Sequence, residues 1–503
     1  MIHRLLPCLL LAFALTLTAE LRDIHILQTA DVHTQLRPTT HGTGGLLAAA
    51  TVIRQARERL SPDRTLLIDC GDTTQGTIAA TLSQGQVGLR PLKLLGYDVW
   101  VPGNHEFDYG IDTFLDFMRQ TSDIALCANL TVRGQPPFRP WTLLTRNGLK
   151  IAVIGLTSSY MRNWLLPADA QSLTIHNHRT LLPKLLADIR THQPDAIILA
   201  AHQGWVPNTD TRGVNDIEDI ASRFPEIALI LGAHTHRDFP GTTIGHRTWY
   251  LQPPPHANAV AHATLTIDTD AHRVVSVTSQ LLPVPRNTPH DPELEQALLP
   301  FIRQEQHERQ RLLDASLAQA IPSRGIPGTS CATSELIATA IAQATGAAVV
   351  FHGKLSNHEL PAGKLHGHDL HRLLPYDNAI VTATLTLDDI QTILNEQLKW
   401  RRHYSFNGIY GATAILNPAT GQATLTGLGK TGTLPLDTTN AQRLLVAFNA
   451  HAAAGSGRFT ALRAILAQPQ ANTTQLNLST RQAVENFLAK HPNLTLTPFP
   501  WLQ

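Results

Sequence analysis

Short apolar runs alternate with helix-like stretches through the first half of the chain. The runs have strand length and lie at Ile24–Thr29, Thr65–Asp69, Asp98–Val101, Lys150–Leu156, Asp195–Ala201 and Ile227–Gly232. Stretches with helical periodicity separate them, at Leu46–Leu60, Ile111–Arg119, Thr180–Arg190 and Asn215–Arg223. This alternation predicts a layered α/β domain whose strands are largely buried.

A change in composition ends this pattern. The stretch Leu281–Asp291 is rich in proline, which is typical of a domain boundary. A charged helical pattern follows, from about Pro292 to Ala320, and predicts a solvated interdomain helix. We therefore predict a first domain over 20–285, a linker and helix over 286–320 and a second α/β domain over 321–503. The second domain should contain a helix at Ser334–Thr345 and strands at Ala347–Phe351, Ala379–Leu387, Thr413–Leu416 and Leu444–Phe448.

Residues 1–19 have the pattern of a targeting segment. Arg4 supplies a positive charge, and Leu5–Ala19 is an apolar stretch too short to span a bilayer. We expect cleavage after Ala19 and a periplasmic or secreted protein without stable membrane insertion. The 503 residues carry a formal net charge of +1, which gives no global field to attract a nucleic acid polymer. The sequence leaves the oligomeric state open.

Five polar motifs each follow an apolar run. They are Asp31-Val32-His33, Gly71-Asp72, Gly103-Asn104-His105-Glu106, His202-Gln203-Gly204 and His234-Thr235-His236. In open α/β sheets ligands bind beyond the carboxyl ends of the strands, so the motifs should converge there. Each motif alone occurs often as a turn, a cap or a packed core residue. Their joint occurrence, each at the end of a strand, favours a metal site.

The motifs supply nitrogen and oxygen ligands together. The candidate ligands are two Asp, one Asn and four His: Asp31, His33, Asp72, Asn104, His202, His234 and His236. Such mixed sets suit Mn, Fe, Zn, Co or Ni better than Ca or Mg alone. A pair of these ions activates a bridging water and clamps the attacking and leaving oxygens, which suits displacement at phosphorus.

His105 is left over as a catalytic candidate. It directly follows the ligand Asn104 and could stabilise the transition state or protonate the leaving group. Asp108, three residues on, could orient His105 and raise its pKa.

We expect structural or surface roles for the other histidines and the cysteines of the mature chain. Cys70 and Cys127 could pair, but buried free thiols are the favoured reading for these cysteines and Cys331. The histidines read as exposed or structural are His41, His176, His178, His246, His256 and His262.

The order of the motifs resembles that of the calcineurin-like metallophosphoesterases. The run Asn104-His105-Glu106-Phe107-Asp108 resembles, more narrowly, the exported bacterial 5′-nucleotidase family, which includes UDP-sugar hydrolases and 2′,3′-cyclic-nucleotide phosphodiesterases. The resemblance implies a four-layer αββα sandwich followed by a smaller α/β substrate-binding domain. It also implies His105 and Asp108 as the catalytic pair and two divalent ions, one held by Asp31, His33, Asp72 and His236 and the other by Asp72, Asn104, His202 and His234.

The second domain resembles the nucleotide-binding half of that family, with departures. Phe406 matches one of two aromatic residues that sandwich the base, and Phe448 matches the approach to the second; core packing is the alternative for both. The family's phosphate-binding Arg is Asn357 here, and Lys354 would compensate only in part because it lacks the bidentate fork of Arg. The family's Gly-Gly-Asp-Gly reads Ala454-Gly455-Ser456-Gly457, which removes an acidic contact to the nucleoside.

Three functions follow from these observations. The first is hydrolysis of a nucleotide phosphomonoester or a cyclic nucleotide by a metal-bridging hydroxide, with a small-molecule phosphate ester as the partner. The second is hydrolysis of another anion on the same scaffold, such as a nucleotide sugar, a sugar phosphate, a diphosphate or a sulfur oxyanion. The third is metal-dependent recognition without turnover, against which the presence of His105 argues.

Overall fold

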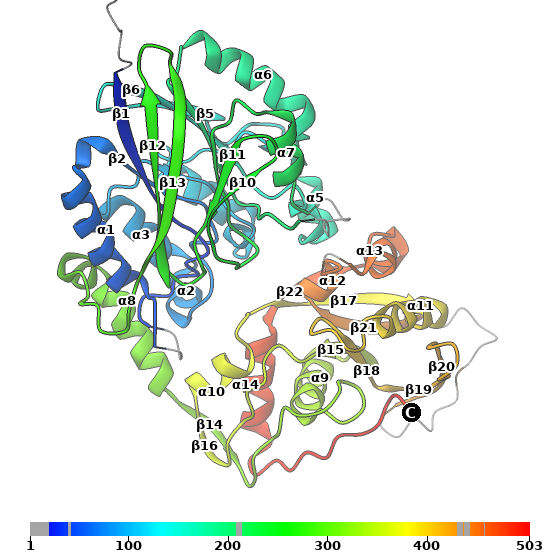
Figure 1. Cartoon of the computed structure of the whole chain (residues 1–503). Helices are drawn as coiled ribbons and strands as arrows, with labels where there is room; N and C mark the ends of the chain where they lie inside the picture. The colour runs from blue at the N-terminus through cyan, green and yellow to red at the C-terminus, as the bar shows by residue number, and fades with distance from the viewer. Residues whose placement is uncertain (1–19, 39–41, 208–213, 430–435, 437–442, 457) are drawn as a thin grey trace, which may run out of the picture.

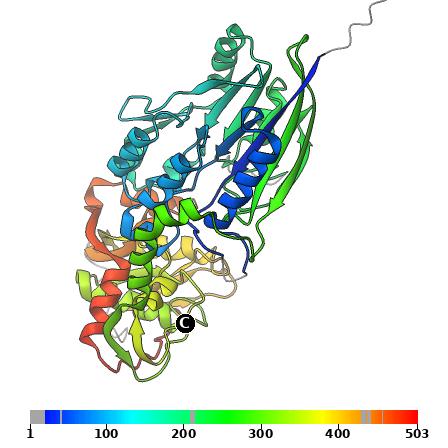
Figure 2. The ribbon, with the colours of Figure 1, turned by 90° about the vertical axis from the view of Figure 1, so that its left-hand side faces the viewer.

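The computed structural model describes residues 20–38, 42–207, 214–429, 436, 443–456 and 458–503. The expected targeting segment and His41 lie outside these residues. Two lobes are joined by the helix α8 (Pro292–Gln310), which runs between them (Figures 1 and 2).

The N-terminal lobe contains two sheets. The first has the strand order β13 (Arg273–Pro283), β12 (Ala259–Asp268), β1 (Leu21–Thr29), β2 (Thr65–Asp69) and β3 (Val99–Trp100). The second has the order β10 (Phe239–Ile244), β11 (Thr248–Gln252), β9 (Leu229–Leu231), β8 (Ala196–Ala201), β6 (Leu149–Leu156) and β5 (Trp141–Arg146). Strands β1, β2 and β3 run parallel, as do β6, β8, β9 and β11. The carboxyl ends of the parallel strands in each sheet therefore share one edge.

Side chains alternate across a strand, so the inner strands of each sheet contribute to a core on both faces. Ile24 and Ile26 of β1 pack in the core between the two sheets, and Leu27 packs in the core under the outer helices. In β8, Ile198 lies between the sheets and Leu199 belongs to the opposite core. Helices therefore cover both outer faces, and the predicted four-layer αββα sandwich is confirmed. The covering helices are α1 (Leu46–Leu60), α3 (Gln86–Leu94) and α4 (Ile111–Gln120) on one side and α6 (His178–Thr191) and α7 (Ile217–Arg223) on the other.

The C-terminal lobe is a smaller α/β unit around one hydrophobic core. Its sheet has the order β18 (Asn407–Tyr410), β15 (Val349–Gly353), β21 (Arg443–Asn449), β17 (Ala379–Thr386) and β22 (Thr474–Ser479). Strand β15 is parallel to β21, and β17 is antiparallel to it. The ends of β15 and β21 and the start of β17 therefore lie at one edge of this sheet. Its helices are α9 (Ala332–Thr345), α10 (Gly367–Leu373), α11 (Leu387–Leu398), α12 (Ala450–Ala453), α13 (Thr460–Leu466) and α14 (Thr480–Lys490).

The charged helix is shorter than the sequence predicts. We expected it to reach Ala320, but α8 ends at Gln310 and the strand β14 (Leu312–Leu317) follows. Arg311 leaves the helical conformation, and its guanidinium binds Glu308 and also Glu485 of α14. Strand β14 then pairs with β16 (Gly363–His366). The helical pattern is overridden because tertiary partners satisfy this segment as a strand.

The remaining elements are short, and they connect or flank the layers. In the N-terminal lobe they are β4 (Leu130–Val132), β7 (Leu173–Ile175), α2 (Ile78–Ser83) and α5 (Pro167–Gln171), and in the C-terminal lobe the pair β19 (Ala412–Leu416) and β20 (Ala423–Leu428). Within the described residues, no helix is both long and apolar enough to cross a membrane. Cys70, Cys127 and Cys331 are buried free thiols, as expected.

Candidate metal centre

The five motif loops of the N-terminal lobe meet at the carboxyl edges of the two sheets. Asp31 follows β1, Asp72 follows β2 and Asn104 follows β3, while His202 follows β8 and the histidine pair follows β9. Metal-ligating atoms gather there in two groups that share Asp72. One group contains Asp31, His33, Asp72 and His236, and the other contains Asp72, His202 and His234.

The distances within these groups are short. The Asp72 Oδ2 atom lies 3.2 Å from His202 Nε2 and 3.8 Å from His33 Nε2. The two Nε2 atoms of His33 and His236 are 3.0 Å apart, and His236 Nε2 is 3.6 Å from an oxygen of Asp31. Asn104 joins the second group, because its side-chain oxygen lies 3.2 Å from His202 Nε2. All seven predicted ligands are therefore brought together.

Backbone carbonyls fix the orientation of two of the imidazoles. His33 Nδ1 lies 3.1 Å from the carbonyl oxygen of Gln75, and His202 Nδ1 lies 2.7 Å from that of Cys70. A carbonyl oxygen only accepts, so each Nδ1 carries the hydrogen and, in the neutral ring, Nε2 presents a lone pair to the cluster. Ligating histidines in metalloproteins are typically held in this way. The donor set therefore fits divalent ions. The lone pair of His33 Nε2 faces His236 Nε2 at 3.0 Å, and either a cation or the N–H hydrogen of His236 can lie between the two atoms.

The ligand loops hold a strained backbone. Asp31, His33, Asp72, His234 and His236 all have positive φ, between 50° and 71°. Such conformations cost on the order of 1 kcal/mol or more in a residue other than glycine, and they persist where the surroundings impose them. The backbone N–H of His234 donates to both carboxylate oxygens of Asp31 at 3.0 Å, and the N–H of His33 donates to the carbonyl of Asp72. These bonds tie the ligand loops to one another across the two sheets.

Glu106 is a site residue that the sequence analysis did not single out for a role. Its carboxylate is fully buried and accepts backbone N–H groups from Asp72 at 3.0 Å, Thr73 at 2.7 Å and Gly103 at 2.5 Å. It therefore holds the loop after β2 against the loop after β3. A carboxylate within the Asn-His-Glu run was the only signal for this role in the sequence.

His105 stands at the edge of the cluster with its side chain 27% exposed. Its backbone N–H donates to Asp72 Oδ1 at 2.8 Å, and its Nδ1 lies 2.8 Å from Asp108 Oδ2. Its ring lies parallel to that of Tyr376 from the C-terminal lobe, with centroids 6.3 Å apart. Asp108 thus orients His105 so that Nε2 is free to face a ligand.

Burial and the carboxylates divide the histidines into two electrostatic classes. Burial lowers the pKa of His33 and His234 to about 3 and that of His236 to about 4, so these rings are neutral near pH 7. For His105, burial lowers the pKa, but Asp108 and Asp72 outweigh it and raise the pKa to about 10. In the absence of metal, three imidazoles are therefore available as ligands while His105 is cationic.

The pKa values of the two carboxylates shift in opposite directions, although burial acts to raise both. Burial raises the pKa of Asp31 to about 8. Burial also acts to raise the pKa of Asp72, but His202 and His105 outweigh it and hold that pKa well below its usual range. Asp72, shared by the two groups, is thus the anionic centre of the cluster.

Further aromatic groups border the site. The His256 ring lies 5.9 Å from that of His33 and 6.3 Å from that of His236, so His256, which we expected to be exposed or structural, is a neighbour of the cluster. Trp164 lies 5.0 Å from His234 between ring centroids. By contrast, His178 is a structural residue in an ion pair with Asp219 at 2.6 Å, as the sequence analysis expected.

The two expected base-stacking residues lie in the core, which corrects that prediction. Phe406 is 2% exposed and Phe448 is fully buried. Phe448 lies on the central strand β21 and stacks on Phe351 with ring centroids 5.5 Å apart. Neither ring can offer a face to a base. Among the described residues, the exposed aromatic side chains of this lobe include Tyr376 and Tyr404.

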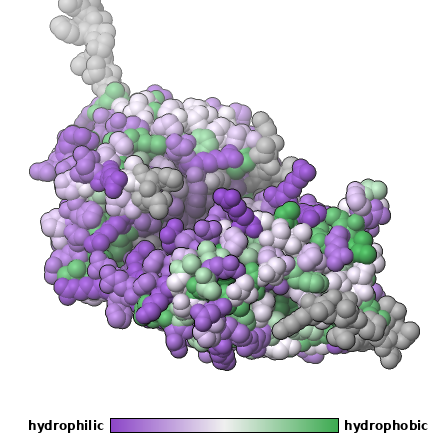
Figure 3. Space-filling model, turned by 90° about the horizontal axis from the view of Figure 1, so that it is seen from below, coloured by the Kyte–Doolittle hydropathy of each residue, from purple (hydrophilic) through white to green (hydrophobic). Residues whose placement is uncertain are grey.

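Lys354 and Asn357 are placed differently from the two phenylalanines. Both follow β15 at the sheet edge where Tyr376 precedes β17, and Tyr376 contacts His105. Lys354 is half-buried and Asn357 is exposed. A hollow between the two lobes, bordered mainly by hydrophilic residues, is visible from below (Figure 3).

The fold and the ligand groups are those of a calcineurin-like metallophosphoesterase. The family model described as calcineurin-like phosphoesterase matches residues 24–238, and that of the 5′-nucleotidase C-terminal domain matches residues 315–464. The chain belongs to the 5′-nucleotidase family of these phosphoesterases.

Curated relatives and a solved structure agree with this placement. The chain is 28% identical to a 5′-nucleotidase of Vibrio parahaemolyticus over 219 residues, which are 42% of this chain and 39% of the relative. It is 30% identical to protein UshA of Escherichia coli over 231 residues, 42% of this chain and 40% of the relative. These matches thus span about two fifths of the relatives' length. The structure of a putative 5′-nucleotidase from Staphylococcus aureus superposes with a TM-score of 0.80 and covers 96% of this chain, while this chain covers 99% of that structure. The two sequences are 18% identical, so this similarity shows the fold alone.

Proposed function

We propose that this protein hydrolyses phosphate esters, and specifically nucleotide phosphomonoesters. The observation that carries the proposal is the pair of ligand groups that share Asp72, with the His105–Asp108 pair beside them. Membership of the 5′-nucleotidase family supports the choice of a nucleotide as substrate.

The proposed ligands divide between two divalent ions as the family resemblance implies. Asp31, His33, Asp72 and His236 would hold one ion, and Asp72, Asn104, His202 and His234 would hold the other. The mixed donor set suits Mn, Zn, Fe, Co or Ni. Bound ions would supply positive charge to the phosphoryl oxygens and lower the pKa of a nucleophilic water.

His105 performs the proton transfer in this proposal. Asp108 holds Nδ1, which leaves Nε2 to donate a proton to the leaving oxygen. The carboxylates around His105 favour the imidazolium, so the proton is available before the phosphorus–oxygen bond breaks. The Asp72 carboxylate positions the His105 backbone and so links the acid to the ligand cluster.

The two lobes have different roles in this proposal. Residues 20–285 carry the catalytic groups, 286–320 link the lobes, and 321–503 bind the organic part of the substrate. Lys354 and Asn357 would contact an anionic or polar group of the substrate from the sheet edge near His105. Because Phe406 and Phe448 are buried, an exposed ring such as Tyr404, which is 81% exposed, would stack on a base.

Phosphate release by the Mn-loaded protein tests the proposal. We expect turnover of nucleoside monophosphates, its loss on chelation and its recovery on adding Mn²⁺. His105→Ala should lower kcat by about 10²- to 10⁴-fold with unchanged metal content, because it removes a proton donor and no proposed ligand. The matched control is His176→Ala, a histidine that hydrogen-bonds Thr131 at the surface. Equal kcat for His105→Ala and wild type would refute the role of His105. Absence of phosphate release from every substrate by the metal-loaded wild type would instead favour metal-dependent recognition.

A second candidate is hydrolysis of another anion on the same scaffold. It is favoured by the burial of Phe406 and Phe448 and by Asn357 at the position of the family's Arg. The same assay should therefore include cyclic nucleotides, nucleotide sugars, sugar phosphates and diphosphates. Turnover confined to the non-nucleotide substrates would replace the nucleotide proposal and leave the metal centre standing.

We also propose export to the periplasm or beyond. The support is the sequence pattern of Arg4 followed by the apolar stretch Leu5–Ala19. Mass spectrometry of the chain recovered from a bacterial host should find a mature form that begins at Glu20 in the periplasmic fraction. A full-length chain confined to the cytoplasm would contradict export.

A further inference from the structure

A second histidine cluster lies in the C-terminal lobe, outside the site described above. It combines His358 from the loop after β15 with His366 at the end of β16 and His368 and Asp369 in the first turn of α10. The Asp369 carboxylate is its buried centre, with a side chain only 5% exposed. Ligating atoms of His366, His368 and Asp369 lie close enough together to hold one ion.

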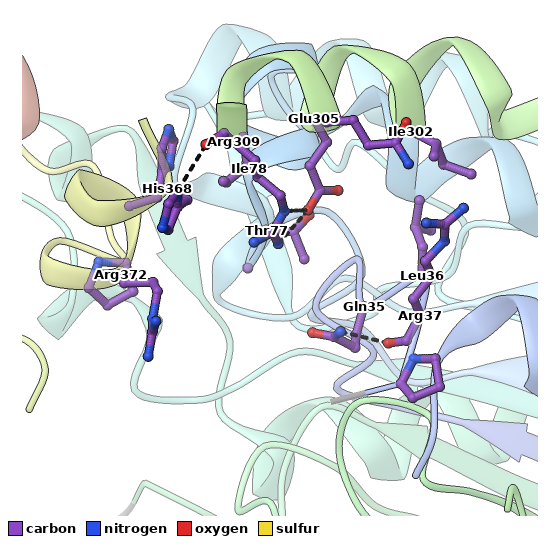
Figure 4. Close-up of a pocket in the computed structure, with 15 residues that line it drawn as sticks. Gln35, Leu36, Arg37, Thr77, Ile78, Ile302, Glu305, Arg309, His368 and Arg372 are labelled. Atoms are coloured by element: carbon purple, nitrogen blue, oxygen red, sulfur yellow. Dashed lines mark hydrogen bonds and ion pairs between the residues drawn. The ribbon is translucent and has the colours of Figure 1, made fainter. Parts of the chain in front are cut away.

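The hydrogen bonding of His368 leaves one ring nitrogen facing the carboxylate. Its Nδ1 lies 2.9 Å from the carbonyl oxygen of Arg309, at the end of α8 (Figure 4). That oxygen only accepts, so Nδ1 carries the hydrogen. In a neutral ring, Nε2 then directs its lone pair at Asp369 Oδ1, 3.3 Å away. This contact repels unless a cation or a second proton lies between the atoms.

His358 supplies an independent observation. Its Nε2 atom is buried, has no hydrogen-bond partner among the described residues, and lies 4.0 Å from the same Oδ1 of Asp369. The other carboxylate oxygen, Oδ2, accepts the backbone N–H of His366 at 2.8 Å. Oδ1 is thus the oxygen left to bind a ligand, and two imidazole nitrogens face it from different segments.

We propose that His358, His368 and Asp369 bind a divalent transition-metal ion of the Zn²⁺ class, with His366 beside them as a further imidazole. Zinc takes nitrogen and carboxylate ligands at about 2.0–2.2 Å, which places tetrahedral ligands about 3.3 Å apart. The separation of His368 Nε2 and Asp369 Oδ1 already has this value. The Nε2 atom of His358 lies 4.0 Å from the same oxygen and would have to move closer to bind the same ion. The carbonyl of Arg309 holds the far nitrogen of His368, as in known metal sites.

The ion would fasten three segments together. It would link the loop that carries Lys354 and Asn357 to α10, and through the Arg309 carbonyl to the end of α8. A cavity of about 350 Å³ lies between α8, α10 and the loop after β1, and His368 lines it (Figure 4). The His368 side chain is 37% exposed, so the proposed site is open to solvent. The proposal is independent of the proposed function, because none of its ligands belongs to the metal centre of the N-terminal lobe.

Zinc content measured by mass spectrometry of metals tests this site. The full chain is stripped with a chelator, incubated with excess Zn²⁺ and desalted. Wild type should retain one more Zn²⁺ per chain than the double variant His358→Gln/His368→Gln. The matched control His192→Gln/His307→Gln replaces two exposed histidines and should retain the wild-type number.

A second measurement and a second variant accompany the zinc measurement. The kcat for phosphate release with Mn²⁺ at saturating substrate should be equal in wild type and in the double variant, which shows that the lost ion is not a catalytic one. Asp369→Asn serves if the double variant fails to fold, because its amide oxygen can still accept the N–H of His366 while it ligates Zn²⁺ poorly. Equal zinc content in wild type and in these variants would overturn the proposal.

Discussion

Gly103 determines how closely the loops after β2 and β3 approach each other. A Cβ atom at this position would lie 2.2 Å from Asp72 Oδ1 and 2.7 Å from His202 Cε1. Both distances are far inside van der Waals contact, and the two neighbours are proposed ligands. The site therefore needs glycine here for space rather than for an unusual backbone angle.

Gly103→Ala should weaken metal binding. The added methyl group displaces Asp72 and His202, so we expect metal affinity to fall by at least about tenfold and phosphate release to fall with it. Metal titration of the chelator-treated protein measures this. Gly134→Ala is the matched control, because open space surrounds Gly134 in an exposed turn. This variant should lower the free energy of unfolding somewhat and leave metal binding unchanged. Equal metal affinity in Gly103→Ala and wild type would contradict this role of Gly103.

At the residue scale, the sequence identified the proposed metal ligands better than it identified the residues around them. The seven ligand positions were visible because each lies in a polar motif after an apolar run, and parallel strands bring such positions to one edge. The function of Glu106 depends on backbone N–H groups of the loop after β2 and of Gly103 in its own loop, and no motif encodes these contacts. The burial of Phe406 and Phe448 depends on the packing of β18 and β21 in the sheet, so a match to family aromatics could not settle it.

Helix α9 carries a buried carboxylate that couples folding to pH. Glu335 is only 8% exposed, and Trp501 near the C-terminus donates an indole N–H to it at 3.0 Å. Burial raises its pKa to about 7. The folded chain therefore holds this proton at pH values where the unfolded chain has released it. The stability that this proton contributes is fully present below the ordinary pKa of a glutamic acid and is lost as the pH rises through about 7.

Glu335→Gln should remove this pH dependence. The amide stays neutral and can still accept from Trp501, so relative to wild type the variant should gain stability, on the order of 1–2 kcal/mol, between pH 5 and pH 8. Thermal melts across this range measure the difference. Glu58→Gln, on the exposed face of α1, is the control and should follow the wild-type curve. A constant difference in melting temperature between Glu335→Gln and wild type at every pH would contradict the assignment.

At the element scale, buried strands and amphipathic helices were predictable because their periodicity is local. The bounds predicted for α1 and β2 agree with the structure, and those of α4, α6, β6 and β8 differ by one or two residues. Strand β14 departs from the predicted helix because Arg311 binds Glu485 across the lobe, and this partner is remote in sequence. The hairpin of β12 and β13 was missed because β13 alternates polar and half-buried residues on an exposed edge.

Arg463 joins the two lobes at the level of the whole molecule. From α13 its guanidinium donates to the backbone carbonyl of Arg162 at 2.6 Å and to that of Leu165 at 3.2 Å, both in the N-terminal lobe. Both carbonyls belong to the loop that carries Trp164, which borders the metal centre. The contact therefore connects the arrangement of the lobes to the site.

Arg463→Ala should loosen the arrangement of the two lobes. Loss of these bonds removes on the order of 1 kcal/mol from the contact between the lobes, so we expect KM to change by about fivefold with metal content unchanged. Small-angle scattering should show a larger radius of gyration. Arg443→Ala is the control, because its bonds to the carbonyls of Thr384 and Gln470 stay within one lobe. The same scattering curve for Arg463→Ala and wild type would contradict this role.

The ring of Tyr376 lies over the proposed acid His105, and this has a consequence for speed. A substrate that reaches His105 must enter between the lobes, and its products must leave by the same way. We predict that movement of the lobes, rather than the bond-breaking step, limits turnover. Adding sucrose or glycerol to raise the viscosity of the solution should slow kcat roughly in proportion for wild type. In the His105→Ala protein the bond-breaking step should limit turnover, so its kcat should not change with viscosity.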